Sequence, residues 1–361
     1  MITVEELLQQ LVERGGSDLH ITAGSPPKIR IDGKLISTEH NVLDPETSQK
    51  LVYSVMDNEQ VSRFERDMEL DMSFGIAGLG RFRTNVFLQR GAVGSVMRII
   101  PFEIKPPEEL NLNMDTVDQL CKQPKGLILV TGATGSGKST TLASMLDYIN
   151  RNRNEHIVTI EDPIEFVHRN KGCLINQREV GTDTNSFQSA LRHVLRQDPD
   201  IVLIGELRDQ ATIEAALTLA ETGHLTLASL HTSDAVQTVN RVVDVFPAYQ
   251  QQQIRTQMSF TLQAVFSQQL IVKADGRGRI LAAEVLIANS AVRSLIREDK
   301  AHQIYSIIQT GGKAGMTTMN QSLFELVAKN VCTQEEVFAR TMDPDDLKRL
   351  FTRGARAPAA R

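Results

Sequence analysis

Cysteines are few in this sequence, and positive charge is not in excess. The three cysteines, Cys121, Cys173 and Cys332, are widely separated and include no C-x-x-C pair. This spacing argues against a disulfide framework and against a zinc site, and it fits a reducing compartment. The formal net charge is −5, which argues against a general surface for polyanions but leaves room for a local basic patch.

Long apolar runs are also absent. No stretch approaches the roughly 18 apolar residues that a membrane-spanning helix requires, so we expect no direct membrane insertion. The N-terminus carries Glu5 and Glu6 where a secretory signal peptide would be basic. We therefore expect a cytoplasmic protein that can still act at a membrane by docking on another protein. The 361 residues, 41% hydrophobic and 23% charged, suggest two or three ordinary globular domains.

A glycine-rich stretch in the middle of the chain carries the clearest motif. The pattern G-x-x-x-x-G-K-[ST] runs from Gly132 to Ser139, after a strand-like apolar run at residues 127–130 and before a helix-compatible segment. Glycines let the backbone curl so that successive N–H groups point at phosphate oxygens, and the helix adds the positive end of its dipole. Lys138 is expected to reach the β- and γ-phosphates, and the Ser139 hydroxyl to bind Mg²⁺. The predicted nucleotide-binding residues are Gly132, Ala133, Thr134, Gly135, Ser136, Gly137, Lys138, Ser139 and Thr140.

Carboxylates gather just past a second predicted strand. Glu161, Asp162 and Glu165 follow an apolar run at residues 157–160. Ligands of parallel α/β sheets collect at the carboxyl ends of strands, so this acidic segment is expected to face the phosphate loop. An Asp or Glu held near Mg²⁺ suits the orientation and deprotonation of an attacking water. The alternative is a solvated acidic turn.

Another apolar strand, at residues 200–204, leads to Gly205 and Glu206. It resembles a Walker B strand, except that Gly205 stands where many nucleotide hydrolases have Asp. Glu206 is expected to act through a water bound to Mg²⁺ or on the attacking water. The alternative is a buried strand that ends in Glu by chance.

Two histidines, His224 and His231, bracket a further predicted strand at residues 225–230. Histidine at this place could sense a γ-phosphate by hydrogen bonding. A lone histidine is more often structural, and the neighbouring sulfur and carboxylate groups lack the spacing of a metal site. Both residues are therefore candidates for hydrogen bonding rather than for metal binding.

The first 104 residues have the pattern of a small α+β domain. A capping box and an amphipathic period predict a helix over residues 3–14, and alternation around an Asp-Gly turn predicts a hairpin at residues 28–36. Along one predicted strand, apolar residues alternate with Arg81 and Arg83, so one face is apolar and the other partly basic. The further predicted elements are a helical segment at residues 45–66 and strands at 71–75, 81–90 and 94–100.

Proline punctuates the next segment and predicts a linker over residues 105–116. Beyond it, strand-like apolar runs alternate with helix-compatible stretches through residue 288. This alternation favours a largely parallel sheet with flanking helices. Residues 289–352 are helical only, with cap signals at Thr333 and at Asp343. Residues 353–361 contain only Gly, Ala, Pro and Arg, which predicts a disordered tail.

The phosphate loop, the acidic segment, the Gly-Glu strand end and the paired histidines occur in an order and spacing that resemble the secretion ATPase superfamily. This superfamily powers type II secretion and type IV pili, and the chain looks most like its pilus retraction members. The similarity runs from residues 17–20 to residues 315–320 and includes residues 176–179 and 241–247. The chain departs mildly at Leu207, where Met is usual, and at Val292 and Ser294, where Ile and Asn are usual.

The resemblance implies a RecA-like P-loop ATPase domain, a smaller N-terminal PAS-like α+β domain and a C-terminal helical region. It implies a hexameric ring that hydrolyses ATP with Mg²⁺ and drives pilus retraction and twitching motility. The expected partners are further copies of the chain, an inner-membrane pilus platform protein and a paralogous retraction ATPase, with no nucleic acid. The expected location is peripheral, at the inner-membrane base of the pilus machine.

The resemblance also assigns roles by position. Glu165 is expected to be the general base, and Glu206 the Walker B carboxylate that shares Mg²⁺ with Ser139. His224 and His231 are expected to form the histidine box. Arginines of the N-terminal domain, Arg81, Arg83 and Arg98, are expected to approach the phosphates; the alternative is that they are a polar sheet face.

Other functions remain as alternatives. Assembly-type ATPases usually add an N-terminal domain and a four-cysteine zinc insertion, and neither is expected here. The nearest alternatives are an accessory retraction ATPase and an assembly or secretion ATPase. A regulator that binds ATP without hydrolysing it is disfavoured because binding alone needs no acidic base. A nucleic-acid translocase is disfavoured by the acidic net charge and an aromatic content of 5%.

Overall fold

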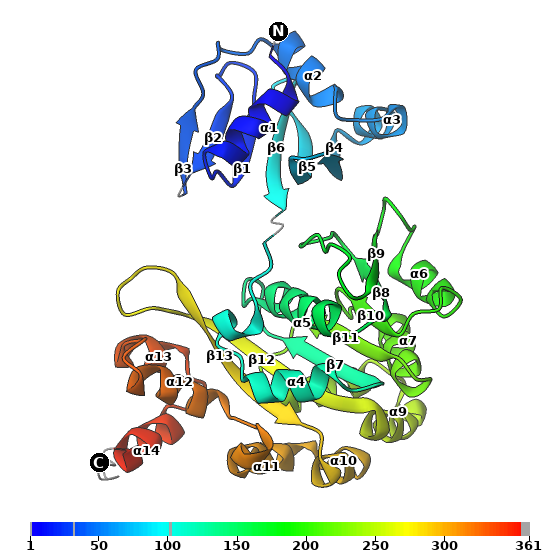
Figure 1. The fold of residues 1–361 in the computed structure, drawn as a ribbon, viewed down its shortest axis with the longest axis vertical. Helices are drawn as coiled ribbons and strands as arrows, with labels where there is room; N and C mark the ends of the chain where they lie inside the picture. The colour runs from blue at the N-terminus through cyan, green and yellow to red at the C-terminus, as the bar shows by residue number, and fades with distance from the viewer. Residues whose placement is uncertain (1, 32, 101–102, 355–361) are drawn as a thin grey trace. The chain divides into compact units, whose positions relative to one another are not determined.

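The computed structural model describes residues 2–31, 33–100 and 103–354, and the chain divides into two compact units (Figure 1). The first unit comprises Met1–Glu103 and Glu165–Val167, and the second comprises Ile104–Ile164 and His168–Arg361. Each unit has its own hydrophobic core. In the described part of the chain, no helix combines the length and the apolar character needed to cross a bilayer.

The first unit is built on a six-stranded antiparallel sheet in the order β3-β2-β1-β6-β5-β4. Helix α1 contributes Leu7, Leu8 and Leu11 to the core. The helices are α1 (Val4–Glu13), α2 (Pro45–Tyr53) and α3 (Asn58–Asp67). The strands are β1 (Asp18–Ile21), β2 (Lys28–Ile31), β3 (Lys34–Ser37), β4 (Glu69–Ile76), β5 (Gly80–Gln89) and β6 (Ala92–Ile100).

Most predicted elements of this unit are present. The capping box of α1 forms between Thr3 and Glu6, and β2 pairs with β3 as a hairpin. The single helical segment predicted at residues 45–66 is wrong, because α2 and α3 are separate helices. Asp57 accepts a hydrogen bond from the backbone N–H of Gln60, and this cap starts a new helix. Strand β1 was not predicted, because only four residues form it and its alternation is short.

The second unit is built on a seven-stranded sheet in the order β13-β12-β7-β11-β10-β8-β9, in which only β13 is antiparallel to its neighbour. The predicted parallel strands are confirmed as β7, β8, β10 and β11, and β9, β12 and β13 were not predicted. The strands are β7 (Gly126–Thr131), β8 (His156–Glu161), β9 (Leu174–Glu179), β10 (Ile201–Ile204), β11 (Leu225–Leu230), β12 (Leu262–Val272) and β13 (Arg279–Ile287). The helices up to β12 are α4 (Met114–Cys121), α5 (Lys138–Asn152), α6 (Phe187–Val194), α7 (Gln210–Glu221), α8 (Ala235–Asp244) and α9 (Ala248–Thr261).

Residues 105–116, which the proline pattern predicts as a linker, contain the 3-10 helix η1 (Pro107–Leu110) and the start of α4. Leu112 is buried in the core of the second unit, and the Asn111 side chain donates a hydrogen bond to the Leu281 carbonyl over 2.9 Å. This segment is therefore packed onto the second unit.

The region after β13 is helical, as predicted, apart from an isolated bridge at Thr317. Thr333 accepts a hydrogen bond from the N–H of Glu336, and Asp343 accepts one from the N–H of Asp346. The predicted tail begins too early, because Arg353 lies in the last helix; residues 355–361 fall outside the described residues. The elements are α10 (Ser290–Arg297), η2 (Ala301–Gln303), α11 (Ile304–Thr310), η3 (Gly312–Ala314), α12 (Met319–Ala328), α13 (Gln334–Arg340) and α14 (Pro344–Gly354).

Candidate active site

The glycine-rich loop connects β7 to α5, as its motif requires. Strand β7 is fully buried between β11 and β12, so the loop emerges at the carboxyl end of a central strand. Ligands of open parallel sheets bind at this edge. Helix α5 begins at Lys138 and runs for 15 residues, so its dipole directs a partial positive charge at the loop.

Gly132 occupies a position that no other residue fits. Its φ is +143°, and a Cβ there would lie 2.5 Å from both the Gln268 carbonyl oxygen and the Ser136 Oγ. The Ser136 hydroxyl is buried and has no hydrogen-bond partner within the described residues. A buried donor without a partner is costly. Its position inside the loop therefore fits a ligand that accepts hydrogen bonds, such as a phosphate.

Lys138 is buried over the same loop. Its Nζ donates hydrogen bonds to the carbonyl oxygens of Gly132 and Ala133, over 2.8 and 3.0 Å. Burial lowers the pKa of Lys138, and the charge of nearby Glu206 opposes this shift. The ammonium group is thus held at the loop by backbone carbonyls, which an anionic ligand can replace as partners.

Glu206 follows β10 and lies at the centre of a charged group. One of its carboxylate oxygens is 3.3 Å from Nε2 of His231, and the other is 3.0 Å from the guanidinium of Arg208. Arg208 also lies 3.6 Å from the carboxylate of Asp162, on the acidic segment. The structure therefore joins the ends of β8, β10 and β11 at one edge of the sheet.

Gly205 explains why this strand departs from the usual Walker B pattern. A Cβ at position 205 would lie 3.3 Å from the Cα of Glu161 and 3.4 Å from the carbonyl oxygen of Ile160. The carbonyl oxygen of Gly205 accepts a hydrogen bond from Ser229 Oγ over 2.6 Å. An Asp side chain has little space here, and the first carboxylate available is that of Glu206.

The three carboxylates of the acidic segment have different surroundings. Glu161 is buried, and its Oε1 accepts hydrogen bonds from Thr159 and Gln177 over 2.7 and 3.2 Å. Asp162 reaches Arg208, whereas the Glu165 side chain is half exposed. Glu165 is therefore the most solvent-exposed carboxylate of this segment.

The structure does not bring His224 to the same place as His231. His224 precedes β11 and His231 follows it, and seven residues of extended chain span roughly 23 Å. The Nδ1 of His224 lies 3.1 Å from the Leu219 carbonyl oxygen at the amino end of the strand. Of these two histidines, only His231 joins the group around Glu206 within one chain.

The three predicted arginines share one face of the first unit. Arg81 and Arg83 are two positions apart on β5, and Arg83 pairs across the strands with Arg98 on β6. Arg81 donates a hydrogen bond to Ser73 Oγ over 2.7 Å, and Arg98 donates one to the buried Asp18 over 2.8 Å. The exposed Arg83 and Arg98 give this face its positive charge.

Arg208 is a member of the site that sequence reasoning did not single out. It lies two residues after Glu206, in the run Gly-Glu-Leu-Arg-Asp at residues 205–209. The signal in the sequence was its place between Glu206 and Asp209, since an arginine among carboxylates reduces their mutual repulsion.

Comparisons with known proteins found relatives that match almost the whole chain. A family model described as "Type II/IV secretion system protein" matches residues 1–339. The chain is 49% identical to the "Type IV pilus retractation ATPase PilT" of Pseudomonas aeruginosa, over 95% of this chain and 99% of that protein. It is 40% identical to the "Type IV pilus ATPase PilU" of the same organism, over 98% of this chain and 93% of that protein. A crystal structure of the pilus retraction motor PilT with bound ADP has a TM-score of 0.90 and 48% identity, over 97% of this chain and 100% of that one.

Proposed function

Because the chain belongs to the family of type II/IV secretion system proteins, we propose that it is an ATP-hydrolysing motor that drives the retraction of type IV pili. The observation that carries the chemistry is the grouping of Lys138, Glu206 and His231 at the carboxyl ends of adjacent parallel strands. The higher identity to PilT than to PilU supports a retraction motor over an accessory one.

The glycine-rich loop between β7 and α5 binds the phosphates of the nucleotide. Residues 132–140 surround the phosphates with backbone N–H groups, and Lys138 exchanges its carbonyl partners for phosphate oxygens. The Ser136 hydroxyl, which has no partner among the residues that the structure describes, supplies a further donor. The positive end of α5 adds to the attraction.

Ser139 and Glu206 have the donor set that suits Mg²⁺. This cation takes one or two protein oxygens together with phosphates and waters, and it does not need a protein cage. Accordingly, the described residues contain no group of three or more His, Cys, Asp or Glu side chains that could hold a metal. A Mg²⁺ ion held by Ser139 and Glu206 would supply positive charge that offsets the charge of the phosphates.

The remaining groups act on water and on developing charge. Glu165 orients and deprotonates the attacking water, and His231 hydrogen-bonds Glu206 or the γ-phosphate. Arg81, Arg83 and Arg98 stabilise charge on the transferred group. His224 does not act on the nucleotide of its own chain, because it lies at the other end of β11.

In the mechanical step, the two units move relative to each other. Six copies form a ring, ATP binding closes the units, and hydrolysis or product release opens them. The proline-punctuated segment that joins the two units is the hinge. The ring works at the inner membrane by docking on a pilus platform protein, together with a paralogous ATPase.

The chemistry is tested by replacing each carboxylate with its amide. We expect Glu165→Gln and Glu206→Gln to abolish ATP turnover while ATP binding is kept, because the phosphate loop is unchanged. Turnover is measured as phosphate release, and binding with a fluorescent ATP analogue. Glu214→Gln, an exposed position on α7, is the control. Normal hydrolysis in both amide variants would contradict the catalytic roles of Glu165 and Glu206.

The direction of the motor is tested in the native host. Deleting the gene is expected to leave excess surface pili that never shorten, counted by microscopy together with retraction events. Bare cells would mean an assembly ATPase instead. Unchanged pili would indicate an accessory ATPase of the PilU kind, whose 40% identity makes it the second candidate.

A further inference from the structure

The backbone that carries Glu165 is held at two points by side chains of β9. The backbone N–H of Ile164, just before Glu165, donates a hydrogen bond to Glu179 over 3.1 Å. The backbone N–H of His168 donates one to Gln177 over 2.7 Å. Only residues 165–167 lie between these two anchored amides.

Gln177 and Glu179 are suited to this task by their place in the sheet. They are two residues apart on β9, so their side chains project from the same face, and they are the register partners of Thr159 and Glu161 on β8. Gln177 also donates to the Glu161 carboxylate over 3.2 Å. Its amide therefore joins the last residue of β8 to the backbone beyond Glu165.

Glu179 is only 3% exposed, although it is a carboxylate. Burying such a group is unfavourable unless it accepts hydrogen bonds. Its second oxygen is 3.4 Å from the Thr182 hydroxyl, and its own N–H donates to Asp183. The turn after β9 thus folds around the side chain that holds Ile164.

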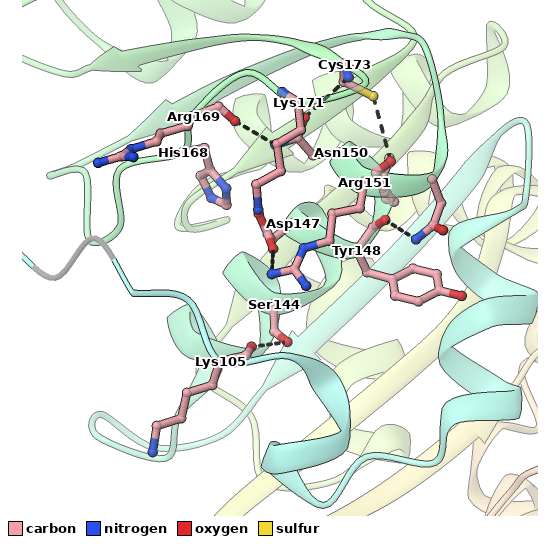
Figure 2. Close-up of polar contacts among 12 residues, drawn as sticks. Lys105, Ser144, Asp147, Tyr148, Asn150, Arg151, His168, Arg169, Lys171 and Cys173 are labelled. Atoms are coloured by element: carbon pink, nitrogen blue, oxygen red, sulfur yellow. Dashed lines mark hydrogen bonds and ion pairs between the residues drawn. The ribbon is translucent and has the colours of Figure 1, made fainter.

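The rest of the connection is fixed to α5, the helix that starts at Lys138. The Asn150 side chain donates to the Arg169 carbonyl over 2.8 Å and accepts from the Lys171 N–H over 3.1 Å. The Lys171 ammonium pairs with the buried Asp147 over 2.5 Å. Figure 2 shows these contacts between the helix and the loop. The stretch that follows residues 165–167 is therefore tied to the phosphate-binding helix.

We propose that Gln177 and Glu179 are positioning residues that hold Glu165 where it can act on the attacking water. This inference rests on the proposed role of Glu165 as the base. A base must be within hydrogen-bond reach of the water, and a displacement of about 1 Å is enough to lower the rate about a hundredfold. Residues that fix the backbone on both sides of Glu165 therefore determine the distance between its carboxylate and the water.

The test uses steady-state ATP hydrolysis by the full chain. Gln177→Ala is expected to lower kcat by ten- to a hundredfold and to change the KM for ATP less than about twofold, because it leaves the phosphate loop intact. Glu179→Gln keeps an oxygen that can accept from Ile164, so it is expected to retain kcat within about threefold. The control is Asn176→Ala, an exposed amide next to Gln177 on the same strand.

Two further readouts separate positioning from general stabilisation. Amide hydrogen exchange of residues 164–168 is expected to become faster in Gln177→Ala and to stay unchanged in Asn176→Ala. In single-turnover measurements, which detect the slow residual hydrolysis that steady-state assays miss, Gln177→Ala is expected to add no further loss when Glu165 is already Gln, since the effect passes through Glu165. An additive loss in that double variant would overturn the positioning role, and so would a wild-type kcat in Gln177→Ala.

The outcomes also separate this inference from the proposed function. If Glu165→Gln is inactive and Gln177→Ala turns over normally, the base assignment stands and the positioning role is wrong. If Glu165→Gln turns over normally, the base assignment fails. The positioning role then fails with it, even if Gln177→Ala changes loop exchange.

Discussion

At the scale of single residues, the site depends on places where two strands lie very close together. The sequence pattern does not reveal such places. Gly205 is the clearest case, because the space that a Walker B Asp would need is occupied by the backbone of β8. The sequence showed that Asp is missing but not why. Likewise, it showed Arg208 as one charge among several, and only the fold places it between Glu206 and Asp162.

We expect Gly205→Ala to destabilise the second unit by about 1–3 kcal/mol, because the added methyl group presses on Glu161 and Ile160. The free energy of unfolding is measured by urea titration. Gly312→Ala is the matched control: a Cβ at position 312 meets no atom within 4 Å, so we expect a change within about 0.5 kcal/mol. Equal midpoints for the two variants would contradict the steric argument.

At the scale of elements, the sequence predicted what local periodicity controls. Strands β7, β10 and β11 are buried along their whole length, so they read as continuous apolar runs. The α/β P-loop ATPase fold that follows from them is confirmed by the likeness to PilT. These runs, with the glycine motif between β7 and α5, were enough to place Lys138 and Glu206 at the same edge.

The missed strands lack that signal. Strand β12 carries Ser267 and Gln268, which are buried because they pair with Thr131 and Thr141, more than a hundred residues away in the chain. Strand β9 carries Gln177 and Glu179, whose partners lie in the loop before it. Such polar strands are stabilised by tertiary hydrogen bonds, and no local pattern predicts them.

His168, in the loop that precedes β9, leads us to expect that the stability of the protein depends on pH. His168 lies beside Asp147 and Lys171 (Figure 2), and burial lowers its pKa from 6.5 to about 4. The unfolded chain therefore binds a proton that the folded chain does not, at any pH between these two values. Stability from the neutral imidazole is fully present above pH 6.5 and is lost as the pH falls toward 4, by about 3 kcal/mol at most.

We expect His168→Gln to lose less stability than the wild type between pH 7 and pH 4.5. The measurement is the urea midpoint across this range. His193→Gln, an exposed histidine on α6, is the control and is expected to follow the wild type. Parallel curves for all three proteins would show that His168 does not govern this acid sensitivity.

At the scale of the whole molecule, the chain consists of two units with separate cores. The groups proposed for ATP binding lie in the second unit, and the arginines proposed to stabilise the transferred charge lie in the first. The proposed motor would gain nothing from rigid union of its units, because its work is proposed to come from their relative movement. The proposed ring adds a second requirement, that the copies act in turn.

This requirement can be measured by mixing subunits. Wild-type protein is dissociated, mixed with Glu206→Gln protein and reassembled, and ATP turnover is followed against the fraction of variant. If the six copies hydrolyse independently, half variant leaves half the activity. If each step depends on its neighbours, activity falls steeply, because random mixing at one half leaves only about 2% of hexamers wholly wild type. We expect the steep curve, and a straight line would contradict sequential action in the ring while leaving the chemistry of each site intact.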